Sequence, residues 1–196
     1  MSDMEIIQAR FRESIETKNR LLQDESLLNM MLILSDAIVD AIRSGGKLLI
    51  CGNGGSASDA SHIAGEIVGR FQKERKGYAA ISLSADVATM TSIANDYGYE
   101  DVFARQVEGL MSRNDILLGI STSGNSLNII KAFKKVKETG GKTALLSGKG
   151  GGELKNLADY AIIIPSDATA RIQEAHLCIY HILCELIEVG LTGNDE

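Results

Sequence analysis

Residues 116–126 read Ile-Leu-Leu-Gly-Ile-Ser-Thr-Ser-Gly-Asn-Ser, an apolar run that passes directly into a polar segment. The run at 116–120 is continuous rather than alternating, as expected for a strand buried on both faces of a parallel sheet. A helical pattern follows at 126–139, so this stretch predicts a strand, a turn and a helix in succession. Such units build folds in which helices cover both faces of a parallel sheet.

The same unit recurs along the chain. Continuous apolar runs typical of buried strands lie at 47–51, 79–83, 116–120, 143–146 and 160–164. Helical patterns separate them, at roughly 56–70, 87–96, 101–112, 126–139 and 152–158. This alternation predicts an α/β fold, a single doubly wound domain with a five-stranded parallel sheet flanked by helices.

Three further helices are expected outside this alternation. Two precede the first strand, at 5–23 and 25–44, and one closes the chain at about 169–189. The last is apolar around most of its circumference, which is typical of a helix buried on more than one side. We therefore expect one domain over residues 1–196, with 1–45 as an N-terminal helical extension. We also expect these three helices to pack between subunits.

Composition excludes several classes of protein. A net charge of −6 argues against non-specific nucleic-acid binding, and the basic run at 131–137 fits a solvated helix face. Neither a secretion signal nor an apolar run of membrane-spanning length is recognisable. The three cysteines, Cys51, Cys178 and Cys184, lack the spacing of a disulfide framework or zinc ribbon. We expect a cytoplasmic protein with neither a nucleic-acid nor a membrane partner.

Two junctions between a strand and a helix can present backbone N–H groups to an anion. Residues 121–126 hold three serines and a threonine, more hydroxyls than a cap needs, which indicates a phosphate-binding loop. Residues 51–57, Cys-Gly-Asn-Gly-Gly-Ser-Ala, fit an anion site and a serine-capped turn equally well. They approach the dinucleotide pattern, but the acidic residue Asp86 comes too late and no Walker pattern occurs, so no nucleotide cofactor is expected. The glycine cluster at 148–152 lacks hydroxyls and is interpreted as a flexible turn.

A few side chains can supply acid–base chemistry. His62 and Glu66 are four residues apart, which places them on one face of the helix that leaves the first glycine loop. Gln173 and His181, eight apart, share roughly one side of the last helix. Taken singly, the first pair also fits a surface contact and His181 a core histidine, and His176 is interpreted as structural. Combined with a phosphate loop, a carboxylate and an imidazole can move a proton between adjacent carbons of a sugar phosphate.

Five motifs follow one another in a fixed order. They are 51–57, His62-x3-Glu66, Ser-Ile-Ala-Asn-Asp at 92–96, 121–126, and Ala-Arg-Ile-Gln-Glu at 170–174. Over almost the whole chain, the set resembles the phosphoheptose isomerases, a branch of the sugar-isomerase (SIS) domain family. A serine-rich loop alone would indicate only the wider family. The resemblance implies an aldose–ketose isomerase that interconverts sedoheptulose 7-phosphate and D-glycero-D-manno-heptose 7-phosphate through an enediol, for bacterial lipopolysaccharide or capsule.

The resemblance also implies roles for particular residues. Glu66 would be the base at the C1–C2 unit, and His181 its acid–base partner. Some members carry zinc, one per subunit, and the matching ligands are His62, Glu66, Gln173 and His181. The family is typically a homotetramer with sites between subunits. Substrate contacts would come from Asn53, Gly54, Gly55, Asn95, Asp96, Ser121, Thr122, Ser123, Ser126 and Gln173.

One departure and three alternatives remain. Ala170 stands where some members have an acidic residue, so a substrate contact there is in doubt, although the hydroxyl of Thr169 can partly substitute. A non-catalytic relative on the same fold binds a bacterial replication initiator and lacks the catalytic Glu and His. A regulatory sugar-phosphate-binding module, or an isomerase of another sugar phosphate, would share the same loops.

Overall fold

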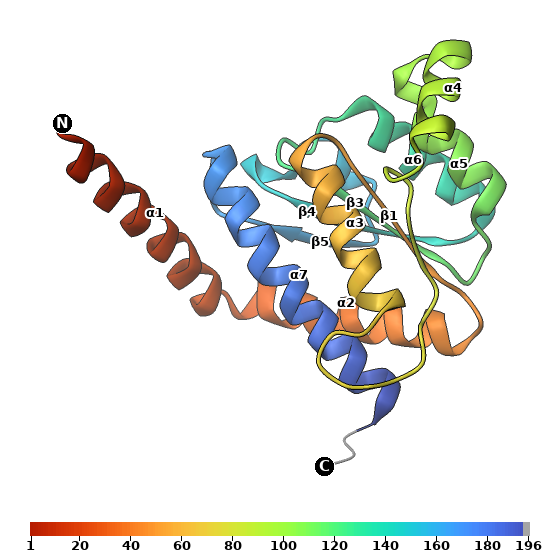
Figure 1. Ribbon diagram of the computed structural model, residues 1–196, viewed down its shortest axis with the longest axis horizontal. Coiled ribbons are helices and arrows are strands. Elements are labelled where there is room, and N and C mark those ends of the chain that lie inside the picture. The colour runs from red at the N-terminus through yellow and green to blue at the C-terminus, as the bar shows by residue number, and fades with distance from the viewer. Residues whose placement is uncertain (194–196) are drawn as a thin grey trace.

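The computed structural model describes residues 1–193 and has a central sheet between two layers of helices (Figure 1). The strands are β1 (Leu48–Gly52), β2 (Ala80–Ser82), β3 (Ile116–Ser121), β4 (Lys142–Ser147) and β5 (Tyr160–Ile163). Their order is β2-β1-β3-β4-β5, and each neighbouring pair runs parallel. The predicted doubly wound α/β fold with a five-stranded parallel sheet is confirmed.

The direction in which the chain adds strands reverses between β1 and β3. From β1 the chain moves outward to β2, and it then returns to place β3 on the other side of β1. Ligands of open α/β sheets bind at such a point, in the crevice outside the carboxyl ends of the two strands. Gly52 is in register with Ile120 at that edge, so the glycine loop after β1 and the serine-rich loop after β3 emerge side by side.

Alternate residues of each strand face opposite helix layers. Leu48 and Ile50 of β1 belong to a core shared with α2, α3 and α7, whereas Leu49 and Cys51 belong to a second core shared with α5 and α6. Burial on both faces explains why β1, β3 and β4 read as continuous apolar runs, whereas the edge strand β2 exposes Ile81. The helix bounds are α1 (Asp3–Gln23), α2 (Glu25–Arg43), α3 (Gly55–Val68), α4 (Val87–Tyr97), α5 (Val102–Leu110), α6 (Leu127–Thr139) and α7 (Thr169–Thr192).

A glycine inside β3 lets α6 approach the sheet closely. A Cβ atom at Gly119 would stand 2.7 Å from Cε1 of Phe133 and 2.8 Å from Cγ2 of Ile129, both buried residues of α6. Any side chain there would push α6 outward. The close approach therefore fixes the first turn of α6 beside the carboxyl end of β3.

The segment 152–158 differs from the sequence prediction. The helix predicted at 152–158 is wrong, because the structure has only a 3-10 turn at Leu154–Asn156. Gly152 has a φ of +52°, in the left-handed region, so a right-handed helix cannot include it. The cluster at 148–152 is a turn, as predicted. It contains a further 3-10 turn at Lys149–Gly151, in which Gly151 is buried.

The first and last helices carry apolar side chains on their surfaces. Helix α1 projects away from the sheet, and Ile7, Phe11 and Ile15 are each at least half exposed (Figure 1). Helix α7 packs in the core along one face but exposes Leu177 and Ile182. By length and a mean hydropathy of 1.3, α7 is also apolar enough to cross a membrane. One face of α7 is buried in the first core, so the helix packs inside the protein as an internal helix does.

His176 of α7 is fully buried, as the structural interpretation of this residue predicted. Within the described residues neither ring nitrogen has a hydrogen-bonding partner of good geometry. Burial lowers the pKa of His176 to about 4, opposed only in part by the backbone of Ser147. The folded protein therefore holds this imidazole neutral at a pH where the unfolded chain would protonate it.

This burial predicts a pH-dependent stability. Because the folded-state pKa lies below the ordinary value of 6.5, stability is complete above pH 6.5 and is lost as the pH falls towards 4. The contribution of His176 to this loss is about 2 kcal/mol at pH 5. Urea unfolding at pH 7 and pH 5 measures it, and His176→Phe should lose less stability between the two than wild type by that amount. Equal losses in the two proteins would contradict the prediction.

Candidate active site

The first glycine loop leaves the N-terminus of α3 open. Gly54 is the residue before the helix, with a φ of +58°, and in the described chain no side chain caps this end. The serine cap considered from the sequence is therefore not formed. Helix N-termini carry unpaired N–H groups and favour negative charge. Gly55, the first helical residue, lies under the amide of Gln173, whose Nε2 is 2.7 Å from the position of a Cβ there.

The serine-rich loop is folded around its own hydroxyl groups. Ser121 Oγ lies 2.9 Å from Ser126 Oγ and accepts a hydrogen bond from the Gly124 N–H at 3.2 Å. The Asn125 N–H donates to Ser123 Oγ at 3.2 Å. Ser126 immediately precedes α6, and within residues 1–193 no side chain caps that helix either. The loop thus brings hydroxyls and an open helix end together.

The glycine cluster at 148–152 packs against this loop and holds it by backbone contacts. Gly124 has a φ of +67°, and a Cβ atom there would collide with the carbonyl group of Gly151. The Gly148 N–H donates to the Thr122 carbonyl at 3.3 Å, and the Glu153 N–H to Asn125 Oδ1 at 2.9 Å. A side chain at Gly124 would therefore shift the serine-rich loop against the glycine cluster. The sequence pattern did not reveal that this cluster supports the loop.

Polar side chains connect the two loops. The amides of Asn53 and Asn128 exchange two hydrogen bonds, at 3.0 and 2.8 Å, and the Tyr99 hydroxyl donates to Asn53 Oδ1 at 2.8 Å. Tyr99 and Asn128 were not predicted as site residues, because neither belongs to a recognisable motif. A cavity of about 580 Å³ opens here, lined by Asn53, Gly98, Tyr99, Glu100, Ser126, Leu127 and Asn128.

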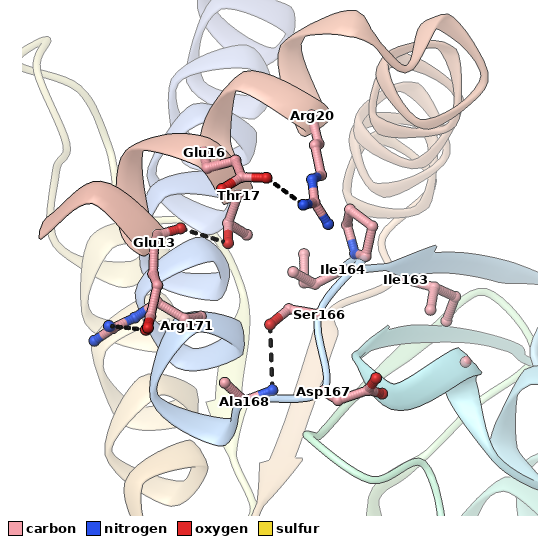
Figure 2. Close-up of a pocket in the computed structure, with 12 residues that line it drawn as sticks. Glu13, Glu16, Thr17, Arg20, Ile163, Ile164, Ser166, Asp167, Ala168 and Arg171 are labelled. Atoms are coloured by element: carbon pink, nitrogen blue, oxygen red, sulfur yellow. Dashed lines mark hydrogen bonds and ion pairs between the residues drawn. The ribbon is translucent and has the colours of Figure 1, made fainter. Parts of the chain in front are cut away.

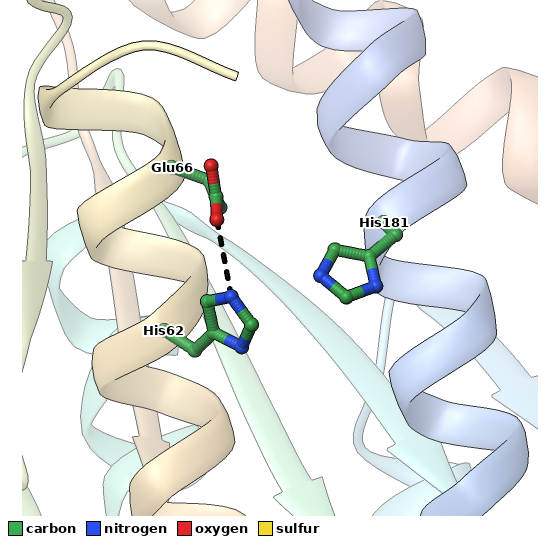
Figure 3. Close-up of side chains that lie close together, drawn as sticks. All are labelled: His62, Glu66 and His181. Atoms are coloured by element: carbon green, nitrogen blue, oxygen red, sulfur yellow. Dashed lines mark hydrogen bonds and ion pairs between the residues drawn. The ribbon is translucent and has the colours of Figure 1, made fainter. Parts of the chain in front are cut away.

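Three acid–base side chains meet where α3 and α7 pack together (Figure 3). His62 Nε2 lies 3.0 Å from Glu66 Oε1, and the rings of His62 and His181 are 5.0 Å apart between centroids. One ligand atom from each residue lies within 4.8 Å of those of the other two. The side chain of His62 is 44% exposed and that of Glu66 23%, so the cluster is open to solvent in this chain.

Tyr180 of α7, Asp59 of α3 and Phe71, which follows α3, surround this cluster. The Tyr180 hydroxyl lies 3.0 Å from His62 Nδ1 and 3.5 Å from Asp59 Oδ1. Burial raises the pKa of Tyr180 to about 12 and also raises the pKa of Asp59 above its ordinary value. The ring of Phe71 stacks on that of His181, with centroids 5.9 Å apart and planes at 21°. These three residues were also not predicted; Asp59 and Tyr180 are close in sequence to His62 and His181, whereas only the fold brings Phe71 to the site.

The other predicted residues lie at separate positions. Asn95 and Asp96 are on α4, with Asn95 Nδ2 donating to Asp96 Oδ1 at 2.8 Å, and both are exposed or nearly so. Ala170 is exposed in the first turn of α7. One region around α3 thus contains the loops 52–55 and 121–126 and the cluster of His62, Glu66 and His181. Asn95 and Asp96 lie outside this region, on α4.

A second cavity, of about 620 Å³, lies between α1, the segment after β5 and the start of α7 (Figure 2). Its polar lining includes Arg20, Ser166, Asp167 and Arg171, and Arg171 forms an ion pair with Glu13 at 3.2 Å. None of the predicted catalytic or substrate-binding residues lines it. We therefore place the candidate active site at the crevice between β1 and β3.

Comparisons with known proteins agree with this geometry. The family model of the SIS domain matches residues 11–148. A phosphoheptose isomerase of Helicobacter pylori strain P12 is 53% identical over 94% of this chain and 95% of its own length. Two solved phosphoheptose isomerases superpose well, from Francisella tularensis (38% identity, TM-score 0.92, 96% of this chain and 99% of that one) and Neisseria gonorrhoeae (37%, 0.90, 95% and 99%). By sequence and by structure, therefore, this chain belongs to the SIS domain family and, within it, to the phosphoheptose isomerases.

Proposed function

We propose that this protein interconverts sedoheptulose 7-phosphate and D-glycero-D-manno-heptose 7-phosphate, and so supplies heptose for bacterial lipopolysaccharide or capsule. One observation carries the proposal: Glu66, His62 and His181 form an acid–base cluster between α3 and α7, and α3 itself begins at one of the two open helix N-termini at the crevice between β1 and β3. A sugar phosphate needs both features, an anion site for one end and acid–base groups for the other. A cytoplasmic location fits the unpaired thiols of Cys51 and Cys184.

The phosphate group of the substrate would bind in the serine-rich loop. Ser121, Thr122, Ser123 and Ser126 offer hydroxyl donors, and the open N-terminus of α6 favours negative charge. Asn53, Gly54, Gly55 and Gln173 would contact the sugar near α3. Asn95 and Asp96 would reach it from α4.

The reacting end of the sugar would lie over the cluster between α3 and α7. The Glu66 carboxylate removes a proton from C1 of the ketose, which gives an enediol, and returns a proton to C2. His181 moves the proton between the oxygens on C1 and C2. Positioned acid–base groups of this kind contribute about 10²- to 10⁴-fold each.

We expect purified protein to form the aldose phosphate from sedoheptulose 7-phosphate, followed by NMR. In Glu66→Gln, turnover should fall at least about a hundredfold because the proton acceptor at C1 is lost. Glu108→Gln is the matched control, since Glu108 also contacts a nitrogen-bearing side chain of its own helix, Arg105, but on the surface of α5. Turnover above roughly a tenth of wild type in Glu66→Gln would exclude Glu66 as the base.

The serine-rich loop can be tested separately from the chemistry. Ser121→Ala and Ser123→Ala should each weaken substrate binding about tenfold or more, because a hydrogen bond to a charged acceptor contributes roughly 1.5–3 kcal/mol. Ser35→Ala serves as control, since Ser35 is as buried as Ser121 but donates only within α2, to the Leu32 carbonyl. Unchanged affinity in calorimetric titrations of both loop variants would remove this loop from the site.

We also propose that the cluster binds one zinc ion per subunit. Two imidazoles and a carboxylate with ligand atoms within 4.8 Å of one another suit zinc, and Gln173 would be the fourth ligand. Zinc bound here would polarise the substrate carbonyl and stabilise the enediolate. A metal-bound Glu66 is a weaker base, so its two roles compete, and a metal-free site in which His181 and Glu66 act directly is the alternative.

Elemental analysis distinguishes these two forms of the site. Protein purified without a chelator or histidine tag should contain close to one equivalent of zinc, and His62→Ala should lose most of it because one imidazole ligand is removed. His176→Phe should keep its zinc, since His176 lies in the core. Full activity with less than about a tenth of an equivalent of zinc would contradict the metal proposal.

A homotetramer with sites between subunits is proposed as the functional assembly. The exposed apolar side chains of α1, including Ile7, Phe11 and Ile15, and those of α7, Leu177 and Ile182, support it. Closed symmetry would bury these faces against copies of themselves. Light scattering at micromolar concentration measures the assembly, and a stable monomer would contradict it.

A further inference from the structure

The segment 69–77, here called the strap, connects α3 to β2 and passes across the C-terminal half of α7 (Figure 1, yellow). It is held there by one carboxylate, Glu188, which is 2% exposed. The backbone N–H groups of Phe71, Gln72 and Lys73 donate to Glu188 at 3.0, 2.7 and 2.9 Å. Burial would raise the pKa of Glu188, but these donors and Arg75 together lower it, so the group stays charged.

Arg75 forms the second half of this arrangement. Its side chain is 4% exposed, and Nε donates to Glu188 Oε1 at 2.8 Å. Its two terminal nitrogens donate to backbone carbonyls at the end of α3, from Nη2 to Glu66 at 2.8 Å and from Nη1 to Ile67 at 3.0 Å. Helix C-termini carry unpaired carbonyls and partial negative charge, so a guanidinium is well suited to this place. Arg75 thus joins the last turn of α3 to α7.

The contacts of this pair converge on the candidate active site. The carbonyl that Arg75 holds belongs to Glu66, the proposed base. Phe71 is one of the three strap residues whose N–H groups donate to Glu188, and its ring stacks on His181. Glu188 and His181 are seven residues apart on α7, about two helical turns, so they lie on nearly the same side. One buried ion pair therefore contacts both helices that carry the cluster and the backbone of Phe71, whose ring stacks on one of its imidazoles.

We propose that Arg75 and Glu188 are positioning residues of the isomerase, which set the placement of Glu66 against His181 through the end of α3 and the Phe71 ring. Neither residue touches the substrate. The proposal rests on the proposed function, because it assigns a role in that reaction. Loss of the pair should lower kcat with little change in KM, since the phosphate loop lies at the other end of the site.

The chain offers a closely matched control. Asp115 is a second buried carboxylate in an ion pair, with Lys47 at 2.7 Å, and it also accepts backbone N–H groups, those of Lys47 and Ser112. It stands at the amino end of β3, opposite the crevice. Glu188→Gln and Asp115→Asn each place an amide where buried N–H donors need an acceptor, so both should lower the thermal unfolding midpoint. Only the first disturbs the strap.

The experiment compares Glu188→Gln, Phe71→Ala, Phe71→Tyr and Asp115→Asn at a temperature where circular dichroism shows all of them folded. We expect kcat to fall about tenfold or more in Glu188→Gln and Phe71→Ala, with KM within about twofold of wild type. Phe71→Tyr and Asp115→Asn should keep kcat within about twofold, because the first retains the stacked ring and the second lies far from it. If Glu188→Gln does not fold, Arg75→Lys takes its place with the same expected fall in kcat, because it keeps a charge for Glu188 but loses the paired contacts to the Glu66 and Ile67 carbonyls.

A second measurement does not depend on activity. The ring protons of His181 are shifted in NMR spectra by the stacked Phe71 ring, and assigned histidine spectra report this contact. Phe71→Ala and Glu188→Gln should move the His181 signals in the same direction, and Asp115→Asn should leave them in place. Unchanged kcat and His181 signals in Glu188→Gln, or equal changes in Asp115→Asn, would overturn the proposal. A wild-type protein without isomerase activity would instead refute the proposed function. The NMR comparison would still test whether Glu188 and the strap set the position of the Phe71 ring on His181.

Discussion

The packing of α3 against α7 is the contact on which the candidate site depends. Ile63 and Ile67 of α3 are buried in the same core as Ile179 and Leu183 of α7. The polar residues of the two helices occupy the positions between these apolar ones, so the hydrophobic contact also brings Glu66 and His62 to His181. Burial of apolar area is non-directional, and directed contacts such as the Tyr180 hydroxyl on His62 must then set the geometry.

The sheet contributes a different kind of constraint. Its reversal between β1 and β3 places two open helix N-termini next to each other, and this follows from topology rather than from any single residue. The proposed anion site and the acid–base cluster therefore have separate structural origins. The first belongs to the strand ends and the second to a helix pair, and α3 takes part in both.

Local sequence was enough to predict the sheet and the pairing of His62 with Glu66. Continuous apolar runs report burial on both strand faces, and a spacing of four reports a shared helix face, so neither needs the rest of the chain. The helix predicted at 152–158 failed because Gly152 requires a positive φ that composition does not show. Tyr99, Asn128 and Phe71 were missed for another reason: their partners lie from 46 to 110 residues away in sequence, and only folding brings them together.

The open end of α3 has a consequence for how members of such a fold diverge. Gly54 and Gly55 can offer a ligand only their backbone N–H and C=O groups, and every amino acid except proline carries both. A mutation that adds a side chain here can abolish binding. It can hardly adjust the selectivity of the site, because the binding groups are backbone atoms. We therefore expect new substrate preferences to arise in side chains around the cavity, such as Tyr99 and Asn53, rather than at these two glycines.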